Sequence, residues 1–83
     1  MDNCVITFRS VTPAQRGEGI LRKAGYGCSI RRTPRWMENQ GCGYSLRVRC
    51  DQVLECVRLL RESQISFRKV YLQREGSMEE MAL

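Results

Sequence analysis

Residues 44–50 read Tyr-Ser-Leu-Arg-Val-Arg-Cys and alternate strictly between one apolar or thiol-bearing residue and one polar residue. This period of two is typical of a β-strand with one buried face. Directly after it, Asp51 is expected to cap a helix that runs from residue 52 to about residue 63. The apolar positions of that helix recur at helical spacing: Val53, Cys56, Val57 and Leu60. The stretch therefore predicts a strand and a helix that bury their apolar sides in one core.

The residues before this stretch follow the same order. Residues 4–8 alternate as a strand, and residues 28–33 form another strand that Pro34 ends. Between them, Thr12 and Gln15 form a capping box around Pro13 and predict the start of a helix. Gly25 is suited to a left-handed stop at its end. Residues 67–72 form the last predicted strand.

The resulting element order is β-α-β-β-α-β, which predicts an α+β fold. We expect a ferredoxin-like split sheet with strand order 4-1-3-2 and both helices on one face. Residues 1–73 form the single domain, and residues 74–83 form a C-terminal tail, where a helical turn started at residues 77–80 would not be stable alone. A chain of 83 residues buries a modest core, so we expect its function on a surface or a loop.

The composition excludes several kinds of site. Histidine is absent, which removes Cys–His and Ser–His–Asp catalysis as well as His-containing zinc sites. The spacing of the cysteines is irregular and contains no Cys-x-x-Cys motif, so no metal site is expected. We therefore expect neither an enzyme with its own turnover nor a bound cofactor. No apolar leader and no apolar run of about 18 residues is visible, so we expect no membrane segment and a cytoplasmic protein with free thiols.

One of the five cysteines differs from the others. Cys42 lies in a Gly41-Cys42-Gly43 sequence within a polar loop, where the glycines give a partner close access to the sulfur. Nearby arginines are expected to favour its thiolate: Arg32, Arg35 and Arg47. The alternative is a turn residue with an incidental thiol. The remaining cysteines occupy apolar positions and are expected to pack in the core: Cys4, Cys28, Cys50 and Cys56.

The outward positions of the predicted strands carry a basic surface. The net charge is +5, and the basic face consists of Arg9, Arg31, Arg47, Arg49 and Lys69. Such a face suits RNA or an acidic protein. RNA-binding sheets of this topology stack bases on strand aromatics, and here only Tyr71 fits that role. A second copy of the chain packing on this face, as a homodimer, is a further alternative.

The chain resembles the selenium/sulfur carrier-like domains, a family of small bacterial proteins. The resemblance covers roughly residues 4–73 and rests on Ile6-Thr7-Phe8, Pro34-Arg35, Cys42-Gly43 and Val70-Tyr71. It implies that Cys42 bears a persulfide or selenide, with Arg35 as a nearby motif residue. A cysteine desulfurase or a related selenium-mobilising protein would load it. The leading hypothesis is thus a carrier between proteins, and the second is a non-catalytic interaction module that uses its basic face.

Overall fold

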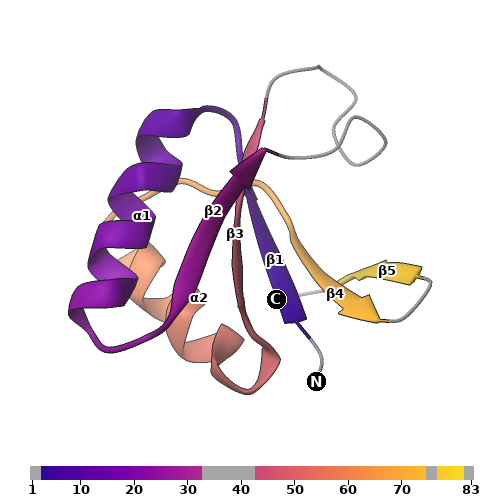
Figure 1. Cartoon of the computed structure of the whole chain (residues 1–83). Coiled ribbons are helices and arrows are strands. Elements are labelled where there is room, and N and C mark those ends of the chain that lie inside the picture. The colour runs from indigo at the N-terminus through magenta and orange to yellow at the C-terminus, as the bar shows by residue number, and fades with distance from the viewer. Residues whose placement is uncertain (1–2, 33–42, 75–76, 82–83) are drawn as a thin grey trace.

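The computed structural model describes residues 3–32, 43–74 and 77–81 of the chain. Figure 1 shows the elements in chain order. They are β1 (Asn3–Phe8), α1 (Val11–Lys23), β2 (Cys28–Arg32), β3 (Tyr44–Arg49), the short 3-10 helix η2 (Cys50–Gln52), α2 (Val53–Glu62), β4 (Val70–Arg74) and β5 (Ser77–Glu80). Among these described residues, no helix has the length and apolar character needed to cross a membrane.

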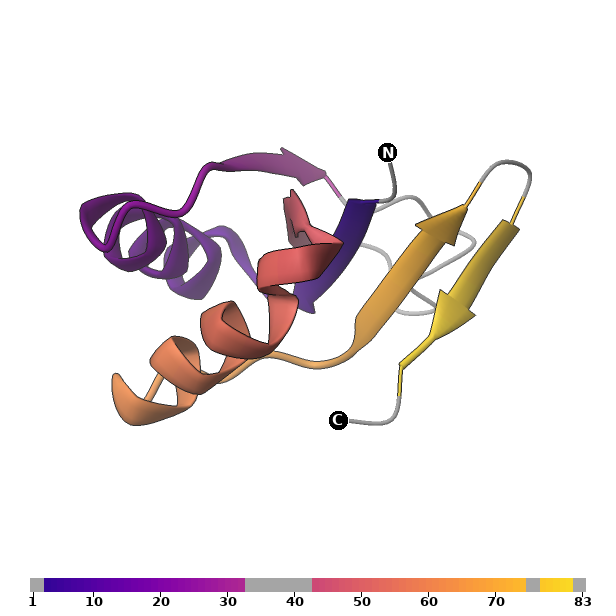
Figure 2. The same cartoon turned by 90° about the horizontal axis from the view of Figure 1, so that it is seen from below.

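The strands form one antiparallel sheet in the order β2-β3-β1-β4-β5. Both helices lie on the same side of this sheet (Figure 2). The α+β class is confirmed, and the predicted order 4-1-3-2 recurs within the observed order. The fifth strand makes the sheet larger than the four-stranded ferredoxin-like sheet that the sequence predicts.

Residues 77–80 form the strand β5, so the expectation that this part of the tail has no stable element of its own is wrong. The register pairs Tyr71 with Glu80 and Arg74 with Ser77. Without β5, β4 would leave a row of backbone N–H and C=O groups unpaired at the sheet edge. An isolated helical turn gains few hydrogen bonds for the backbone order that it requires. Pairing with β4 gives the segment a better set of backbone partners.

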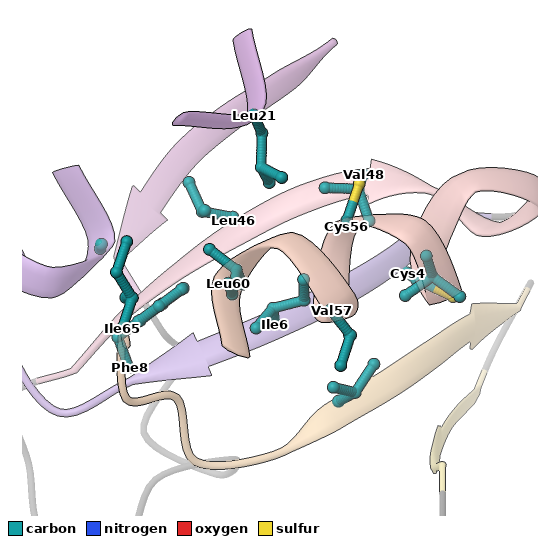
Figure 3. Packing of buried hydrophobic residues seen from close by; sticks show 13 residues of the cluster. Cys4, Ile6, Phe8, Leu21, Leu46, Val48, Cys56, Val57, Leu60 and Ile65 are labelled. Atoms are coloured by element: carbon teal, nitrogen blue, oxygen red, sulfur yellow. The ribbon is translucent and has the colours of Figure 1, made fainter. Parts of the chain in front are cut away.

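The core lies between the sheet and the two helices (Figure 3). The inward positions predicted for β1 and β3 are confirmed, since Ile6, Phe8, Leu46 and Val48 are buried. The helices add a further buried set, and the part from α2 agrees with its predicted apolar positions: Ala14, Gly17 and Leu21 from α1, and Val53, Cys56, Val57 and Leu60 from α2. The inward side chains of β2 are only half-buried, because β2 is an edge strand.

Both predicted helix caps are wrong. Helix α1 begins at Val11 with Ser10 as its N-cap residue, so Thr12 lies inside the first turn. Pro13 still lies in that turn, where its missing N–H leaves no hydrogen bond unmade. Before α2, the turn η2 intervenes and Gln52 takes the N-cap position. Asp51 instead accepts hydrogen bonds from Arg49 Nε at 3.2 Å and Nη2 at 2.9 Å.

Both helices end in the same backbone motif, which satisfies their last carbonyl groups. In α1, Gly25 has a φ of +93°, and the N–H of Tyr26 donates to the carbonyl of Leu21 at 2.9 Å. This confirms the predicted stop at Gly25. In α2, Gln64 takes the equivalent left-handed position with a φ of +59°, and the N–H of Ile65 donates to Leu60 at 2.9 Å. These are the bonds of a Schellman motif.

Candidate functional site

Three of the predicted site residues, Arg35, Gly41 and Cys42, lie outside the described residues. The chain on either side of them is described. Arg32 is exposed at the end of β2 and pairs with Tyr44, the first residue of β3. Gly43, which directly precedes Tyr44, is buried. The strand pairing therefore brings Arg32 close to the residue that joins Cys42 to β3.

The third predicted supporting arginine, Arg47, lies at a different place. Arg47 pairs with Ser29 on β2 and with Val5 on β1. It is three residues beyond Tyr44, which is about 10 Å along a strand. The structure thus does not bring Arg47 together with Arg32. Arg47 instead borders a cavity of about 320 Å³ whose lining also includes Cys28 and Arg49.

Cys4 and Cys50 form a disulfide, so the expectation of free thiols is wrong for this pair. Their Cα atoms are 5.0 Å apart, within the range that a disulfide spans. The strand register explains the proximity. Cys4 pairs with Val48, and Cys50 follows Val48 by two residues on the helix-facing side of the sheet. The two sulfur atoms therefore meet at one end of the core.

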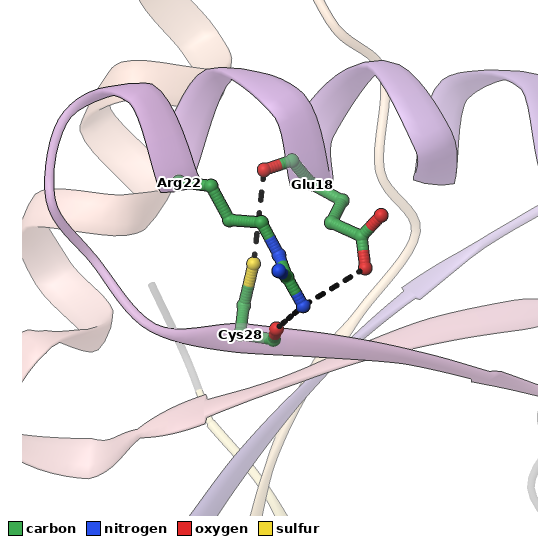
Figure 4. A network of polar contacts seen from close by, with 3 residues as sticks. All are labelled: Glu18, Arg22 and Cys28. Atoms are coloured by element: carbon green, nitrogen blue, oxygen red, sulfur yellow. Dashed lines mark hydrogen bonds and ion pairs between the residues drawn. The ribbon is translucent and has the colours of Figure 1, made fainter.

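Cys28 is a free thiol on the edge strand and is half-buried rather than fully packed in the core. Figure 4 shows its contacts with α1. Its Sγ lies 3.8 Å from the backbone carbonyl oxygen of Glu18, and Arg22 Nη2 donates to the backbone oxygen of Cys28 at 2.9 Å. Arg22 also lies 3.7 Å from the Glu18 carboxylate. Burial raises the pKa of Cys28, and the Arg22 guanidinium offsets this only in part.

Cys56 is a free thiol with no exposed surface, as predicted for a core residue. Burial raises its pKa to about 11, and the neighbouring Cys28 and Glu55 act in the same direction. Both free thiols of the described residues are thus held in the protonated form at neutral pH. A protonated thiol is a poor nucleophile.

The basic face is more heavily paired than the sequence predicts. Arg9, Arg31, Arg49 and Lys69 are exposed, and Arg47 is half-buried. Arg49 forms an ion pair with Asp51 at 2.9 Å, and Lys69 forms one with Glu80 at 3.3 Å. Glu80 reaches Lys69 because β5 extends the sheet, an arrangement that the predicted tail did not include.

The middle of the same face is also closed to solvent. Val5, Thr7 and Ser45 are buried, although they alternate along β1 and β3 with the residues of the core. The Thr7 hydroxyl accepts a hydrogen bond from the backbone N–H of Lys69 at 3.0 Å and lies 3.2 Å from the Lys69 carbonyl. Little of this surface is therefore a flat platform on which a base could stack.

Comparison with known protein families matches residues 3–72 to the family described as "Putative Se/S carrier protein-like". The match includes the segment that contains Arg35, Gly41 and Cys42. No curated protein matches the chain. No solved structure matches it either.

Proposed function

The chain belongs to the selenium/sulfur carrier-like family, and we propose that it holds sulfur or selenium on Cys42 and passes it between proteins. The observation that carries this proposal is the family match, because it spans Cys42 together with nearly the whole described fold. In this proposal the protein has no turnover of its own. A cysteine desulfurase or a related selenium-mobilising protein loads it.

The loading step is a thiol–persulfide exchange. The Cys42 thiolate attacks the outer sulfur of a persulfide on the donor protein. A new sulfur–sulfur bond forms at Cys42, the donor's sulfur–sulfur bond breaks, and the donor cysteine leaves as a thiolate. The step needs an ionised and accessible Cys42, because the thiolate is the nucleophile.

The state of the other cysteines supports Cys42 as the carrier. Cys4 and Cys50 are bonded to each other and have no thiol to offer. Cys56 is fully buried, and burial raises the pKa of both Cys28 and Cys56. Each of the four described cysteines thus lacks at least one property that a carrier needs.

Two described residues on either side of the segment that contains Cys42 support its proposed role as the carrier residue. Arg32 is exposed at the base of the connection that contains Cys42, where its guanidinium favours a nearby anion. Gly43 is buried next to Tyr44 and places no side chain between Cys42 and the sheet. We propose Arg35 as a further supporting residue on the basis of the family motif, and Gly41 because it has no side chain to block access to the Cys42 sulfur.

Alkylation at neutral pH tests whether Cys42 has the required reactivity. The unreduced protein is treated with iodoacetamide for a series of times, and the modified peptides are quantified by mass spectrometry. The proposal predicts that Cys42 reacts faster than Cys28 and far faster than Cys56. Equal or slower reaction of Cys42 relative to Cys28 would remove the basis for a carrier at that position.

The interaction module is the weaker proposal, because two cations of the basic face are paired with carboxylates. It still makes a distinct prediction. Binding to RNA through this face would weaken steeply with salt and would survive Cys42→Ser. The carrier proposal predicts no such binding.

A further inference from the structure

We propose that Cys4, Cys50 and Met81 form a binding site for one Cu(I) ion when the disulfide is reduced. Cys4 and Cys50 are bonded to each other, and Cys4 Sγ lies 3.6 Å from Met81 Sδ. The bonded sulfur of Cys4 has no proton to donate, so this is a contact between two sulfur atoms. The sulfur atom of Cys4 thus adjoins the sulfur atoms of two residues from distant parts of the sequence, Cys50 and Met81.

The backbone holds Cys4 and Met81 in place independently of the disulfide, and Cys50 directly follows Arg49, which pairs with Asn3 of β1. Cys4 lies in the central strand and pairs with Val48 on one side and Leu72 on the other. Figure 3 shows Cys4 at one end of the buried cluster. The backbone N–H of Met81 donates to the carbonyl of Val70 at 2.7 Å. Because the sheet fixes the positions of these residues, reduction is expected to leave the sulfur atoms close together.

The ligand chemistry selects a soft metal ion. Thiolate and thioether sulfurs favour Cu(I), whereas carboxylates and carbonyls favour harder cations. Within residues 3–32, 43–74 and 77–81, no three His, Cys, Asp or Glu side chains gather as a competing site. Two sulfurs that bind one ion at the roughly 2.3 Å of a metal–thiolate bond lie at most about 4.6 Å apart. The 3.6 Å between Cys4 Sγ and Met81 Sδ meets this condition.

Binding requires a reduction and then an exchange of protons for metal. An external dithiol supplies two electrons, becomes a disulfide itself, and leaves Cys4 and Cys50 as two thiols. Cu(I) then displaces both thiol protons into solvent and keeps its own oxidation state. Cys4 has no exposed surface, whereas Cys50 and Met81 are half-buried, so the ion enters from the side of those two residues.

The test is a Cu(I) titration of the reduced full-length chain, without oxygen and after removal of the dithiol, against a chromophoric Cu(I) chelator. We expect one tightly held Cu(I) per chain, both in the native protein and in Cys42→Ser. Met81→Leu keeps the apolar bulk and removes the sulfur, so it should weaken binding by at least about tenfold. Cys28→Ser removes a sulfur outside the site and should leave the affinity unchanged. Affinity should rise about a hundredfold per pH unit while both thiols are protonated in the free protein.

Three results would overturn the proposal: no retained copper, an unchanged affinity in Met81→Leu, or loss of binding in Cys42→Ser. Cys4 is in the core, so Cys4→Ser risks misfolding. Because Cys50 is only half-buried, Cys50→Ser is the second variant, and it should also lose the ion. Because Cys42→Ser abolishes the proposed carrier and is expected to retain copper, failure of one proposal is distinguishable from failure of the other.

Discussion

Gly17 of α1 lies directly against Leu60 of α2, and a Cβ atom at position 17 would come within 3.0 Å of Leu60 Cδ2. It would also lie 3.3 Å from Leu46 Cδ1 and 3.5 Å from Phe8 Cζ. All three neighbouring side chains are fully buried and have little room to move. Gly17 therefore lets the two helices and the sheet approach one another.

Gly17→Ala and Gly19→Ala should change stability in opposite directions. Alanine improves helix propensity at either position by about 0.5–1 kcal/mol. At position 17 the overpacking costs about 1–3 kcal/mol, so a net loss of about 1 kcal/mol is expected. No atom lies within 4 Å of a Cβ at position 19, so Gly19→Ala should stabilise. Urea unfolding of the two variants measures both effects, and a Gly17→Ala protein as stable as Gly19→Ala would refute the packing role.

Gln64→Gly should stabilise the protein by about 1 kcal/mol. Gln64 has a φ of +59°, which is unfavourable for a residue with a Cβ and favourable for glycine. Ser63 precedes it with a φ of −89°, so Ser63→Gly gains no such relief and should destabilise through lost chain entropy alone. Urea unfolding of this matched pair checks the prediction. Destabilisation by both glycines would show that Gln64 is not strained.

Stability should fall between about pH 9 and pH 11 because of Cys56. Burial raises the pKa of Cys56 from 9.0 to about 11, so the unfolded chain loses this proton first. The neutral Cys56 thiol makes its full contribution to the free energy of unfolding below the pKa that Cys56 has in the unfolded chain. That contribution is lost as the pH rises to the pKa that Cys56 has in the folded protein. A difference of about two pKa units corresponds to about 2–3 kcal/mol.

The measurement is urea unfolding at several pH values in a Cys42→Ser background. Lysine and tyrosine side chains also titrate in this window, so the same series in Cys56→Ala supplies the control. Cys56→Ala should be less stable at neutral pH and should show a shallower fall with pH. Parallel curves for the two proteins would mean that Cys56 makes no such contribution.

The fold could be predicted to the extent that it depends on local pattern. The alternation of Tyr44 to Cys50 and the helical spacing of Val53 to Leu60 fix strands, helices and buried faces from residues close in sequence. The edge strand β5 could not be predicted in this way. Residues 77–80 have no apolar alternation, and their strand depends on backbone pairing with β4.

The sequence nominates a candidate residue for the site but does not predict what surrounds the other cysteines. Gly-Cys-Gly and the family motif single out Cys42 without any structure. The bond between Cys4 and Cys50 spans 46 residues and depends on strand register, which the pattern of apolar positions does not encode. The sequence placed both residues on the core side correctly but gave no indication that they adjoin. The contact of Met81 with Cys4 depended on the unpredicted strand β5.

Sulfur loading of Cys42 tests the central claim most directly. The protein is incubated with a cysteine desulfurase and cysteine, without reductant, and its intact mass and peptide map are measured alongside those of Cys42→Ser and Cys28→Ser. We predict the addition of one sulfur atom on Cys42, unchanged loading in Cys28→Ser and none in Cys42→Ser. Sulfur that spreads over Cys28 and Cys42 alike, or loading that persists in Cys42→Ser, would contradict the carrier assignment.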